Sequence, residues 1–219
     1  MSDANSNGVV LGLSGGIDSA VTLSLSVAAL GSDGVTGLIR PYKHTESVDL
    51  AKHHAEQLNV NTETVSIKQI VESFKSSSSL FSEKLSEGNL HSRIRMSILY
   101  GAGFSSNRLV IGTSNKSELL TGYWTKWGDG GTDFLPIGDL YKSQVYSLGE
   151  ELGVPSGILS RKPTAELWEG QTDEEEFGFT YLELDQVLYN LERFDNVSQI
   201  YEKTGISLEK IVKIKKLIQ

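Results

Sequence analysis

The feature that most constrains this chain is a short apolar run that leads through a glycine-serine loop into a helix. Residues 9–13 read VVLGL, which indicates a buried strand. The loop Ser14-Gly15-Gly16-Ile17-Asp18-Ser19 follows, and residues 18–30 are rich in alanine, valine and leucine, which favours a helix. Adjacent glycines let backbone amides approach an anion, and a helix N-terminus favours negative charge. The segment therefore predicts a phosphate-binding loop.

Strand and helix patterns alternate through the first half of the chain. Strands are predicted at residues 35–40, 62–67 and 109–112, helices from residue 45 and over 90–104, and a surface loop at the serine run 76–79. This alternation predicts an α/β fold with a parallel sheet in three layers, with helices on both faces. Beyond Ser114 helices are predicted to dominate, over 140–152, 178–193, 197–204 and 208–218. We expect a single domain over 1–219, with a strand-rich nucleotide-binding part (8–114) and a loop and helical part (115–219).

Composition excludes several classes of function. Twenty basic residues against 28 acidic ones give a formal charge of −8, which predicts no nucleic-acid partner. The absence of cysteine excludes disulfides, thiolate zinc sites and cysteine nucleophiles. No apolar run is long enough to span a membrane, and the first residues, MSDANSNG, lack a secretory pattern. A cytoplasmic protein without a membrane partner is the expectation.

The loop has two other interpretations. Gly12-Leu13-Ser14-Gly15-Gly16 also fits G-x-S-x-G, the nucleophile elbow of α/β-hydrolases, but that fold needs a late histidine and the last one here is His91. A plain strand-to-helix turn would not require an aspartate and two serines beside the glycines. The Walker and G-x-G-x-x-G motifs do not occur.

In a parallel sheet the ligand site lies at the carboxyl ends of the strands, where the strand order reverses. The loops after Leu13, Arg40 and Ile111 should therefore share one crevice. Asp18 and Glu118 both follow predicted strands, and their carboxylates suit a magnesium ion that also binds a polyphosphate. Five cations could neutralise the approach of one anion to another, namely Arg93, Arg95, Lys116, Lys126 and Lys142.

Several motifs in one order resemble those of a known family. The loop SGGIDS resembles the pyrophosphate loop of the ATP pyrophosphatases (PP-loop superfamily), whose fold is adenine nucleotide α-hydrolase-like and Rossmann-like. Residues 89–96, NLHSRIRM, resemble the N-x-x-A-R-x-R-M segment of NAD synthetases, with Ser92 where alanine is usual. Residues 112–118 match G-T-x-N-x-S-E, and residues 122–133 match G-Y-x-T-K-x-G-D-G-x-x-D. Pro136, Leu140, Lys142 and residues 163–168 continue the likeness. The family commonly has a helix before the first strand and a His-Lys pair near its end, and neither occurs in these residues.

The resemblance implies an ammonia-dependent NAD synthetase and assigns roles to positions. ATP would be bound by Gly12, Leu13, Ser14, Gly15, Gly16, Ile17, Asp18, Ser19, Thr113, Lys142 and Thr164. Nicotinic acid adenine dinucleotide (deamido-NAD) would be bound by Arg93, Lys126 and Asp133. Magnesium would be held by Asp18 and Glu118, and the groups expected at the chemistry are Asp18, Lys126 and Lys142.

The implied reaction adenylates the nicotinate carboxylate with ATP, releases pyrophosphate, and lets free ammonia displace AMP to give NAD. The family also implies a homodimer. The alternatives are another PP-loop ligase, of the GMP synthetase or tRNA lysidine ligase type, and a non-catalytic ATP-binding module on the same fold.

The glycine-rich residues 122–138 are predicted to form a mobile segment that closes over the substrates. The alternative is a rigid loop fixed by Trp124, Trp127 and Phe134. Tyr123 has two interpretations as well, since its ring could stack on a substrate ring or anchor this segment.

Overall fold

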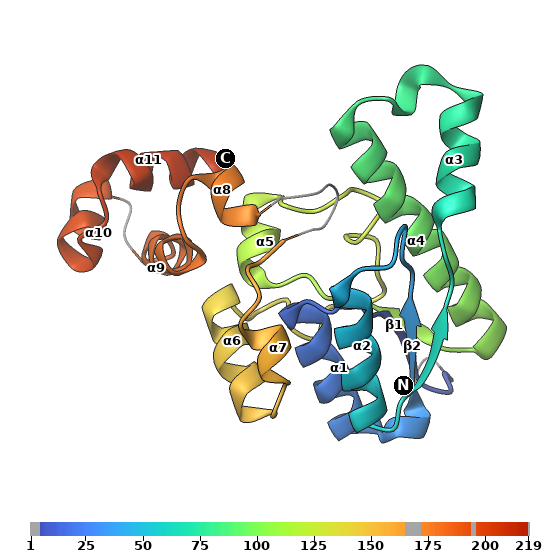
Figure 1. Ribbon diagram of the computed structural model, residues 1–219. Helices are drawn as coiled ribbons and strands as arrows, with labels where there is room; N and C mark the ends of the chain where they lie inside the picture. The colour runs from blue at the N-terminus through green and yellow to red at the C-terminus, as the bar shows by residue number, and fades with distance from the viewer. Residues whose placement is uncertain (1–4, 165–171, 194–195, 219) are drawn as a thin grey trace.

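The computed structural model describes residues 5–164, 172–193 and 196–218. Its centre is a four-stranded sheet in the order β3-β2-β1-β4, in which every pairing is parallel (Figure 1). The strands are β1 (Val9–Gly12), β2 (Val35–Ile39), β3 (Asn61–Thr64) and β4 (Leu109–Ile111). Val9 pairs with Val35 on one side and with Leu109 on the other. The parallel sheet predicted from the sequence is confirmed.

Helices cover both faces of the sheet because successive residues of β1 point to opposite sides. Val9 and Leu11 pack in one apolar cluster with residues of α1 (Ile17–Leu30) and α2 (Glu46–Gln57). Val10 packs in another cluster with Met96 and Leu99 of α4 (Lys84–Ser106). All three apolar residues of β1 are buried, as expected for a central strand between two helical layers.

Two local predictions were wrong. The serine run lies at the end of α3 (Lys68–Ser77) and the start of a short 3-10 helix, η2 (Ser79–Phe81), so it is not a plain loop. The third strand ends at Thr64, although the amide of Val65 still donates to the carbonyl of Ile39. All four β3 residues are exposed, and β3 is an edge strand of the sheet.

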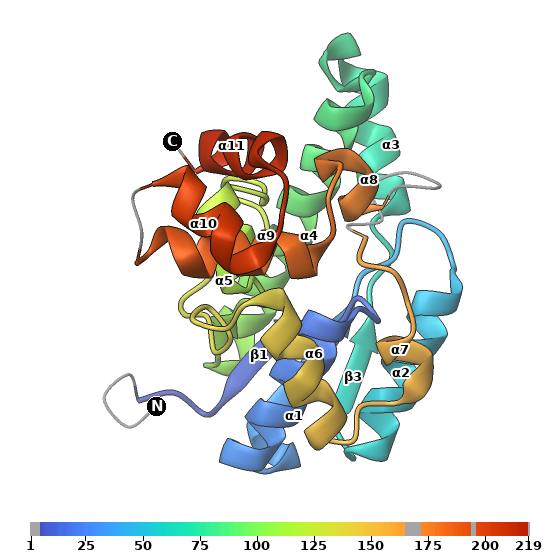
Figure 2. The same ribbon diagram turned by 90° about the vertical axis from the view of Figure 1, so that its left-hand side faces the viewer.

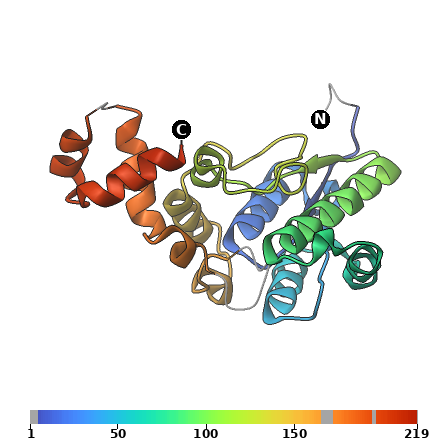
Figure 3. The same cartoon turned by 90° about the horizontal axis from the view of Figure 1, so that it is seen from above.

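The second half of the chain is helical, as predicted. Its helices among the described residues are α5 (Lys116–Thr121), α6 (Lys142–Glu151), α7 (Ser156–Leu159), α8 (Asp173–Phe177), α9 (Tyr181–Leu191), α10 (Val197–Thr204) and α11 (Leu208–Leu217). In the first half, a short 3-10 helix, η1 (Ser32–Gly34), precedes β2. Helices α8–α11 share their own apolar cluster, which includes Phe177, Leu184, Ile200 and Ile211. They lie on the opposite side of the molecule from α3 and α4 (Figures 1 and 3). Helix α6 contacts both α1 and α9 and so joins them to the sheet layer (Figure 2).

The strand order reverses between β1 and β4, because β1, β2 and β3 run outward in sequence while β4 lies on the other side of β1. The ligand crevice of such a sheet lies at this reversal, beyond the carboxyl ends of the two strands. The loop before α1 and the loop before α5 both start there. The fold therefore places the two predicted acidic residues in the first turns of α1 and α5, directly after two adjacent loops.

Candidate functional site

The loop between β1 and α1 has the geometry of an anion-binding turn. Gly15 has a φ of +80°, and a Cβ built on it would lie 2.1 Å from the carbonyl oxygen of Ser47, so a larger residue does not fit. Gly16 is the N-cap of α1 and has no side chain to occupy the open amides of the first turn. Ser14 Oγ accepts from the amide of Gly16 (3.2 Å) and lies 3.1 Å from Ser19 Oγ. Hydroxyls and free amides thus gather at a positive helix end.

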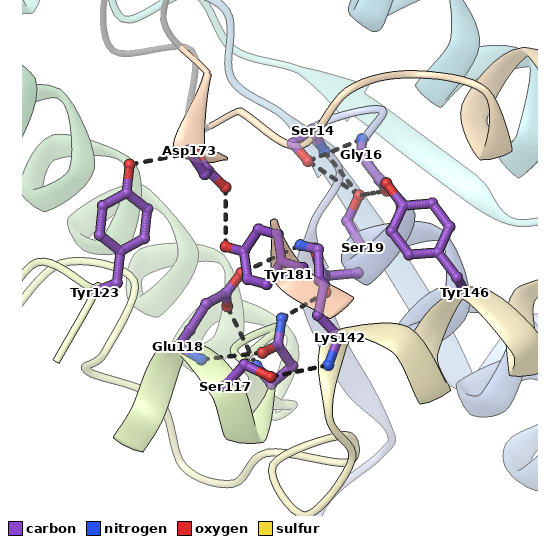
Figure 4. A network of polar contacts seen from close by, with 12 residues as sticks. Ser14, Gly16, Ser19, Ser117, Glu118, Tyr123, Lys142, Tyr146, Asp173 and Tyr181 are labelled. Carbon is purple, nitrogen blue, oxygen red and sulfur yellow. Dashed lines mark hydrogen bonds and ion pairs between the residues drawn. The ribbon is translucent and has the colours of Figure 1, made fainter. Parts of the chain in front are cut away.

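Asp18, Glu118 and Lys142 converge beside this loop from three helices. Lys142 Nζ donates to Asp18 Oδ2 at 2.5 Å and to Glu118 Oε1 at 3.2 Å. Asn115 Nδ2 donates to Asp18 Oδ1 at 2.9 Å, and its Oδ1 accepts from the amide of Glu118 as part of a capping box on α5. Figure 4 shows the group of Glu118 and Lys142 in one view with the loop residues Ser14, Gly16 and Ser19. The structure therefore brings together residues that are 97 and 124 positions apart.

Burial strengthens the electrostatic interactions among Asp18, Glu118 and Lys142, because little water screens them. The side chain of Lys142 is 3% exposed, that of Asp18 18%, and that of Glu118 16%. Burial, with the neighbouring charge of Asp18, raises the pKa of Glu118 to about 8 against the opposing effect of Lys142. Burial alone would lower the pKa of Lys142, but the two carboxylates outweigh it and raise that pKa. The two carboxylates around one ammonium therefore favour one further positive charge, which is a proton on Glu118 when no other cation is present.

A second layer of residues fixes Lys142 in place. Ser117 Oγ accepts from the amide of Lys142 at 3.0 Å and donates to Asp185 Oδ1 at 2.5 Å. Asp185 Oδ2 accepts from the amide of Ser143 at 2.7 Å. Asp185, which is buried on α9, thus accepts from the second amide of α6 and from the hydroxyl that accepts from the first, and so ties three helices together. Sequence reasoning did not identify Ser117 or Asp185.

A tyrosine-aspartate network closes the other side of the site. Tyr181 OH donates to Asp173 Oδ2 at 3.0 Å, and Tyr123 OH donates to Asp173 Oδ1 at 3.2 Å and to Glu176 Oε2 at 2.5 Å. Lys142 Nζ lies 5.0 Å from the centroid of the Tyr181 ring. Burial raises the pKa of Asp173. Tyr123 packs against Phe177, so in this structure its ring anchors the glycine-rich segment.

The three residues predicted to bind the dinucleotide are only partly brought together. Arg93 Nε donates to the carbonyl oxygen of Lys126 at 3.1 Å, so these two lie side by side at the surface. Asp133 lies beside a later turn of α4, where its carboxylate accepts from Tyr100 OH (3.0 Å) and from the amide of Val110 (2.7 Å). Both oxygens of Asp133 are therefore already engaged.

The remaining predicted residues have varied surroundings. Thr113 lies partly buried in the loop that connects β4 to α5, and Thr164 is partly buried at the edge of the described residues. Residues 165–168 of the last motif lie outside the described residues. Lys116 pairs with Glu192 at 2.7 Å instead of joining the group around Asp18. His54 and His91 are buried.

The glycine-rich segment is fastened at several points. The side chain of Asp129 accepts from Ser92 Oγ at 2.7 Å and from the amide of Thr125 at 3.0 Å. Phe134 forms a parallel bridge with Ile111 next to β4. Trp127 is 73% exposed and Trp124 and Phe134 are exposed too, so these aromatic rings do not fix the segment against the helices. Movement of residues 122–138 over the substrates stays a prediction.

The acidic pair suits a magnesium ion rather than a zinc ion. Among the described residues, no group of three or more His, Asp or Glu could enclose a metal. Magnesium is commonly held by one or two carboxylates together with substrate phosphates, and Asp18 and Glu118 reach one common point beside the phosphate loop. The raised pKa of Glu118 shows that a positive charge is favoured here, and a metal ion could take the place of the proton. The residues fit the ion.

Comparisons with known proteins show the family of the chain. A family model described as NAD synthase matches residues 1–219. An NH(3)-dependent NAD(+) synthetase of Thermococcus kodakarensis is 46% identical over 220 residues, which is 100% of this chain and 87% of that protein.

Two solved structures are similar over nearly the whole chain. A structure of NMN synthetase from Francisella tularensis has a TM-score of 0.87 and 39% identity, and the match covers 99% of this chain and 86% of that one. An NH3-dependent NAD synthetase from Campylobacter jejuni, in complex with the nitrate ion, has a TM-score of 0.82 and 34% identity, with 100% and 86% covered. The parallel sheet with helices on both faces is thus a fold that this chain shares with solved relatives.

Proposed function

This chain belongs to the NAD synthase family, and we propose which of its residues carry the ATP- and ammonia-dependent formation of NAD. The carrying observation is the convergence of Asp18, Glu118 and Lys142 beside an open phosphate loop. A non-catalytic ATP-binding module would not need two buried carboxylates around one lysine. The family match also disfavours the GMP synthetase and tRNA lysidine ligase types.

ATP is proposed to bind with its phosphates on the loop from Gly12 to Ser19. The open first turn of α1 and the two serine hydroxyls supply donors to phosphate oxygens. Thr113 follows the carboxyl end of β4, and Thr113 and Thr164 are proposed to contact ATP as well. Arg161 Nη1 donates to the carbonyl oxygen of Gly15 at 3.1 Å, which places a further cation near the loop.

Magnesium is proposed to be held by Asp18 and Glu118, where it would neutralise phosphate charge and help pyrophosphate to leave. Lys142 is proposed to stabilise negative charge on the phosphates in the transition state, since its position is fixed by Ser117 and Asp185. The side-chain amide of Asn115 orients the Asp18 carboxylate.

Deamido-NAD is proposed to bind along α4 and the glycine-rich segment, with Arg93, Lys126 and Asp133 as its contacts. The adjacent cations of Arg93 and Lys126 suit an anionic ligand. Asp133 would have to share or exchange its present partners, Tyr100 and Val110, to take part.

The reaction balances in two steps. A nicotinate carboxylate oxygen attacks the α-phosphorus of ATP, and the bond to the β-phosphate oxygen breaks to release pyrophosphate. Ammonia then attacks the carbonyl carbon of the acyl-adenylate, the bond to AMP breaks, and the nitrogen loses one proton to give the carboxamide. Lys126 lies on a segment whose closure would exclude water from the adenylate.

Free ammonia is the nitrogen source. The 219 residues contain no cysteine, so they cannot supply a thiol nucleophile for hydrolysis of glutamine. A cytoplasmic location, proposed from the sequence, fits an enzyme of NAD biosynthesis.

We propose that the chain forms a homodimer through the outer face of α4. Phe104 is 92% exposed there, Tyr100 lies one turn earlier, and Phe134 is exposed beside Asp133, which binds Tyr100. Gly101 on the same helix has open space around it, which leaves room for close approach of a second helix. Light scattering should give the mass of a dimer, and Phe104→Glu should shift it to that of a monomer. A monomeric wild type at assay concentration would contradict this proposal.

The decisive assay combines the purified chain with ATP, magnesium, ammonium and deamido-NAD. We expect NAD, AMP and pyrophosphate in equal amounts, and no comparable rate when glutamine replaces ammonium. A parallel reaction with nicotinic acid mononucleotide is included because a structural relative is described as an NMN synthetase. Preference for the mononucleotide would overturn the dinucleotide assignment, and release of pyrophosphate on an unrelated acid would overturn the function.

A further inference from the structure

Arg40 lies at the carboxyl end of β2, and its guanidinium rests against the backbone of Gly12. A Cβ built on Gly12 would lie 1.5 Å from Arg40 Nη2, so only glycine leaves room for the guanidinium. Gly12 is the last residue of β1 and the first residue of the proposed ATP-binding loop. The sequence predicted that the loop after Arg40 shares the crevice, but it gave Arg40 itself no role.

The guanidinium is held by main-chain groups. Arg40 Nη1 donates to the carbonyl oxygen of Arg95 at 2.8 Å, and Arg95 Nε donates to the carbonyl oxygen of Arg40 at 3.0 Å. Arg40 Nε is buried without a hydrogen-bond partner. Across the described residues, no carboxylate forms an ion pair with Arg40. Arg40, directly after β2, and Arg95, on α4, thus lie next to each other, because each donates to the backbone carbonyl of the other.

This arrangement is costly unless an anion binds to it. Burial, and then the charge of Arg95, lower the pKa of Arg40 to about 9. The guanidinium therefore stays charged at neutral pH, although its surroundings disfavour the charged form. A buried cation without a counter-charge is unfavourable, and a nearby like charge adds to the cost. The pair lies between the phosphate loop and the helix that carries Arg93. Both substrates of the proposed reaction carry phosphates that would lie there.

We propose that Arg40 is a phosphate-binding residue, which uses its guanidinium, seated on Gly12, to contact a phosphate of ATP or of the dinucleotide. This inference rests on the proposed function for the identity of the substrates. A planar guanidinium can make two parallel hydrogen bonds to phosphate oxygens, which a lysine cannot reproduce. Contact with Gly12 places Arg40 near ATP, while its bonds to Arg95 place it near α4, so the test must separate the two substrates.

The chain offers a matched control at the other end of β1. Arg108 donates from Nη2 to the carbonyl oxygen of Asp33 at 2.8 Å, and its Nη1 is buried without a partner. A Cβ built on Gly8 would lie 2.4 Å from this Nη1. Arg108 therefore has the same local packing, an arginine against a glycine at one end of β1, but it lies at the amino end of the sheet, away from the crevice.

The test compares Arg40→Gln, Arg40→Lys and Arg108→Gln with the wild type. Calorimetry with inorganic pyrophosphate and magnesium measures phosphate binding directly, and steady-state kinetics give KM for each substrate. We expect Arg40→Gln to weaken pyrophosphate binding by about ten- to a hundredfold and to raise the KM of one substrate similarly, with a smaller change in kcat. Arg40→Lys should recover only part of this, and Arg108→Gln should leave binding and KM within about twofold.

The outcomes separate the possible failures. Equal effects of Arg40→Gln and Arg108→Gln on binding, or no effect of Arg40→Gln, would overturn the assignment. A larger KM for ATP alone identifies an ATP phosphate as the ligand, and a larger KM for the dinucleotide alone identifies the other source. If the wild type makes no NAD but pyrophosphate binding still depends on Arg40, the proposed function fails and the phosphate site stands. Urea unfolding of each variant shows whether a loss of binding follows from a loss of folding.

Discussion

Replacing Asp18 by asparagine should damage both activity and stability, and the hydrogen bonds of the carboxylate show why. Both oxygens of Asp18 are acceptors, one for Asn115 Nδ2 at 2.9 Å and one for Lys142 Nζ at 2.5 Å. A side-chain amide has one oxygen and one NH2 group, so in either orientation the new NH2 group would face another donor. The variant also leaves Lys142, which is 3% exposed, with Glu118 as its one remaining carboxylate of this pair.

We expect Asp18→Asn to cost about 2 to 4 kcal/mol of unfolding free energy, because a charge-assisted bond to a buried lysine is lost. NAD formation should fall by about 10²-fold or more, since charge stabilisation at the phosphates also weakens. Urea unfolding and NAD production at limiting magnesium measure the two effects. Asp49→Asn is the control, because Asp49 forms an exposed pair with His44 and should change stability by less than about 0.5 kcal/mol. Wild-type activity of Asp18→Asn at limiting magnesium would refute its place at the metal, and an unchanged unfolding curve would refute the network argument.

Other parts of the structure give three further predictions. Asp185→Ala should destabilise the protein by about 2 to 4 kcal/mol in urea unfolding, and should lower kcat, because the Ser117 hydroxyl and the Ser143 amide lose their shared acceptor. An unchanged kcat would show that Lys142 is held without Asp185. Burial and the nearby charge of Arg95 lower the pKa of His91 to about 4. As pH falls, the unfolded state therefore binds a proton at this histidine before the folded state does. The free energy of unfolding should fall by about 2 kcal/mol as pH drops from about 6.5 to 4. His91→Asn should flatten that part of the pH curve, and an identical slope would contradict the assignment. In the free protein, amide hydrogen exchange should be fast over residues 123–131, and it should become slow when ATP and deamido-NAD bind together. The amide of Asp133, which donates to β4, should be protected in both states. Slow exchange of residues 123–131 in the free protein would favour a rigid loop.

The parts of the fold that sequence predicted well are those that depend on local pattern. The run Val9–Leu13 and the glycines after it locate β1 and the start of α1, and the carboxyl-end rule then places Asp18 and Glu118 together. The network confirms that placement, since Asn115 and Lys142 bridge the two. Assignment of Lys142 required the family resemblance, because nothing in its local pattern distinguishes it from a surface lysine.

The residues that were missed owe their roles to long-range packing. Asp185 lies 68 positions from Ser117, and α9 brings it to the start of α6 only through the apolar cluster of the C-terminal helices. Asp173 belongs to an acidic run in the first turn of α8, and nothing in that run reveals that its carboxylate is bonded by two tyrosines. Helix α3 was missed because its serines suggested a loop, although Val71 packs on α4 and stabilises it.

The charge balance of the site connects the stable fold to the proposed chemistry. Asp18 and Glu118 hold Lys142 at one point, and the raised pKa of Glu118 shows that this buried triad favours one more positive charge, a proton in the free protein. Binding of ATP brings more negative charge to the adjacent loop, so the carboxylates gain from a cation and the lysine gains from phosphate oxygens as new partners. Because Lys142 begins α6 and its amide is fixed by Ser117, its side chain can turn from the carboxylates to the phosphates while its backbone stays in place. The same residues therefore serve as an ion-pair network in the free protein and as separate binding groups in the proposed complex.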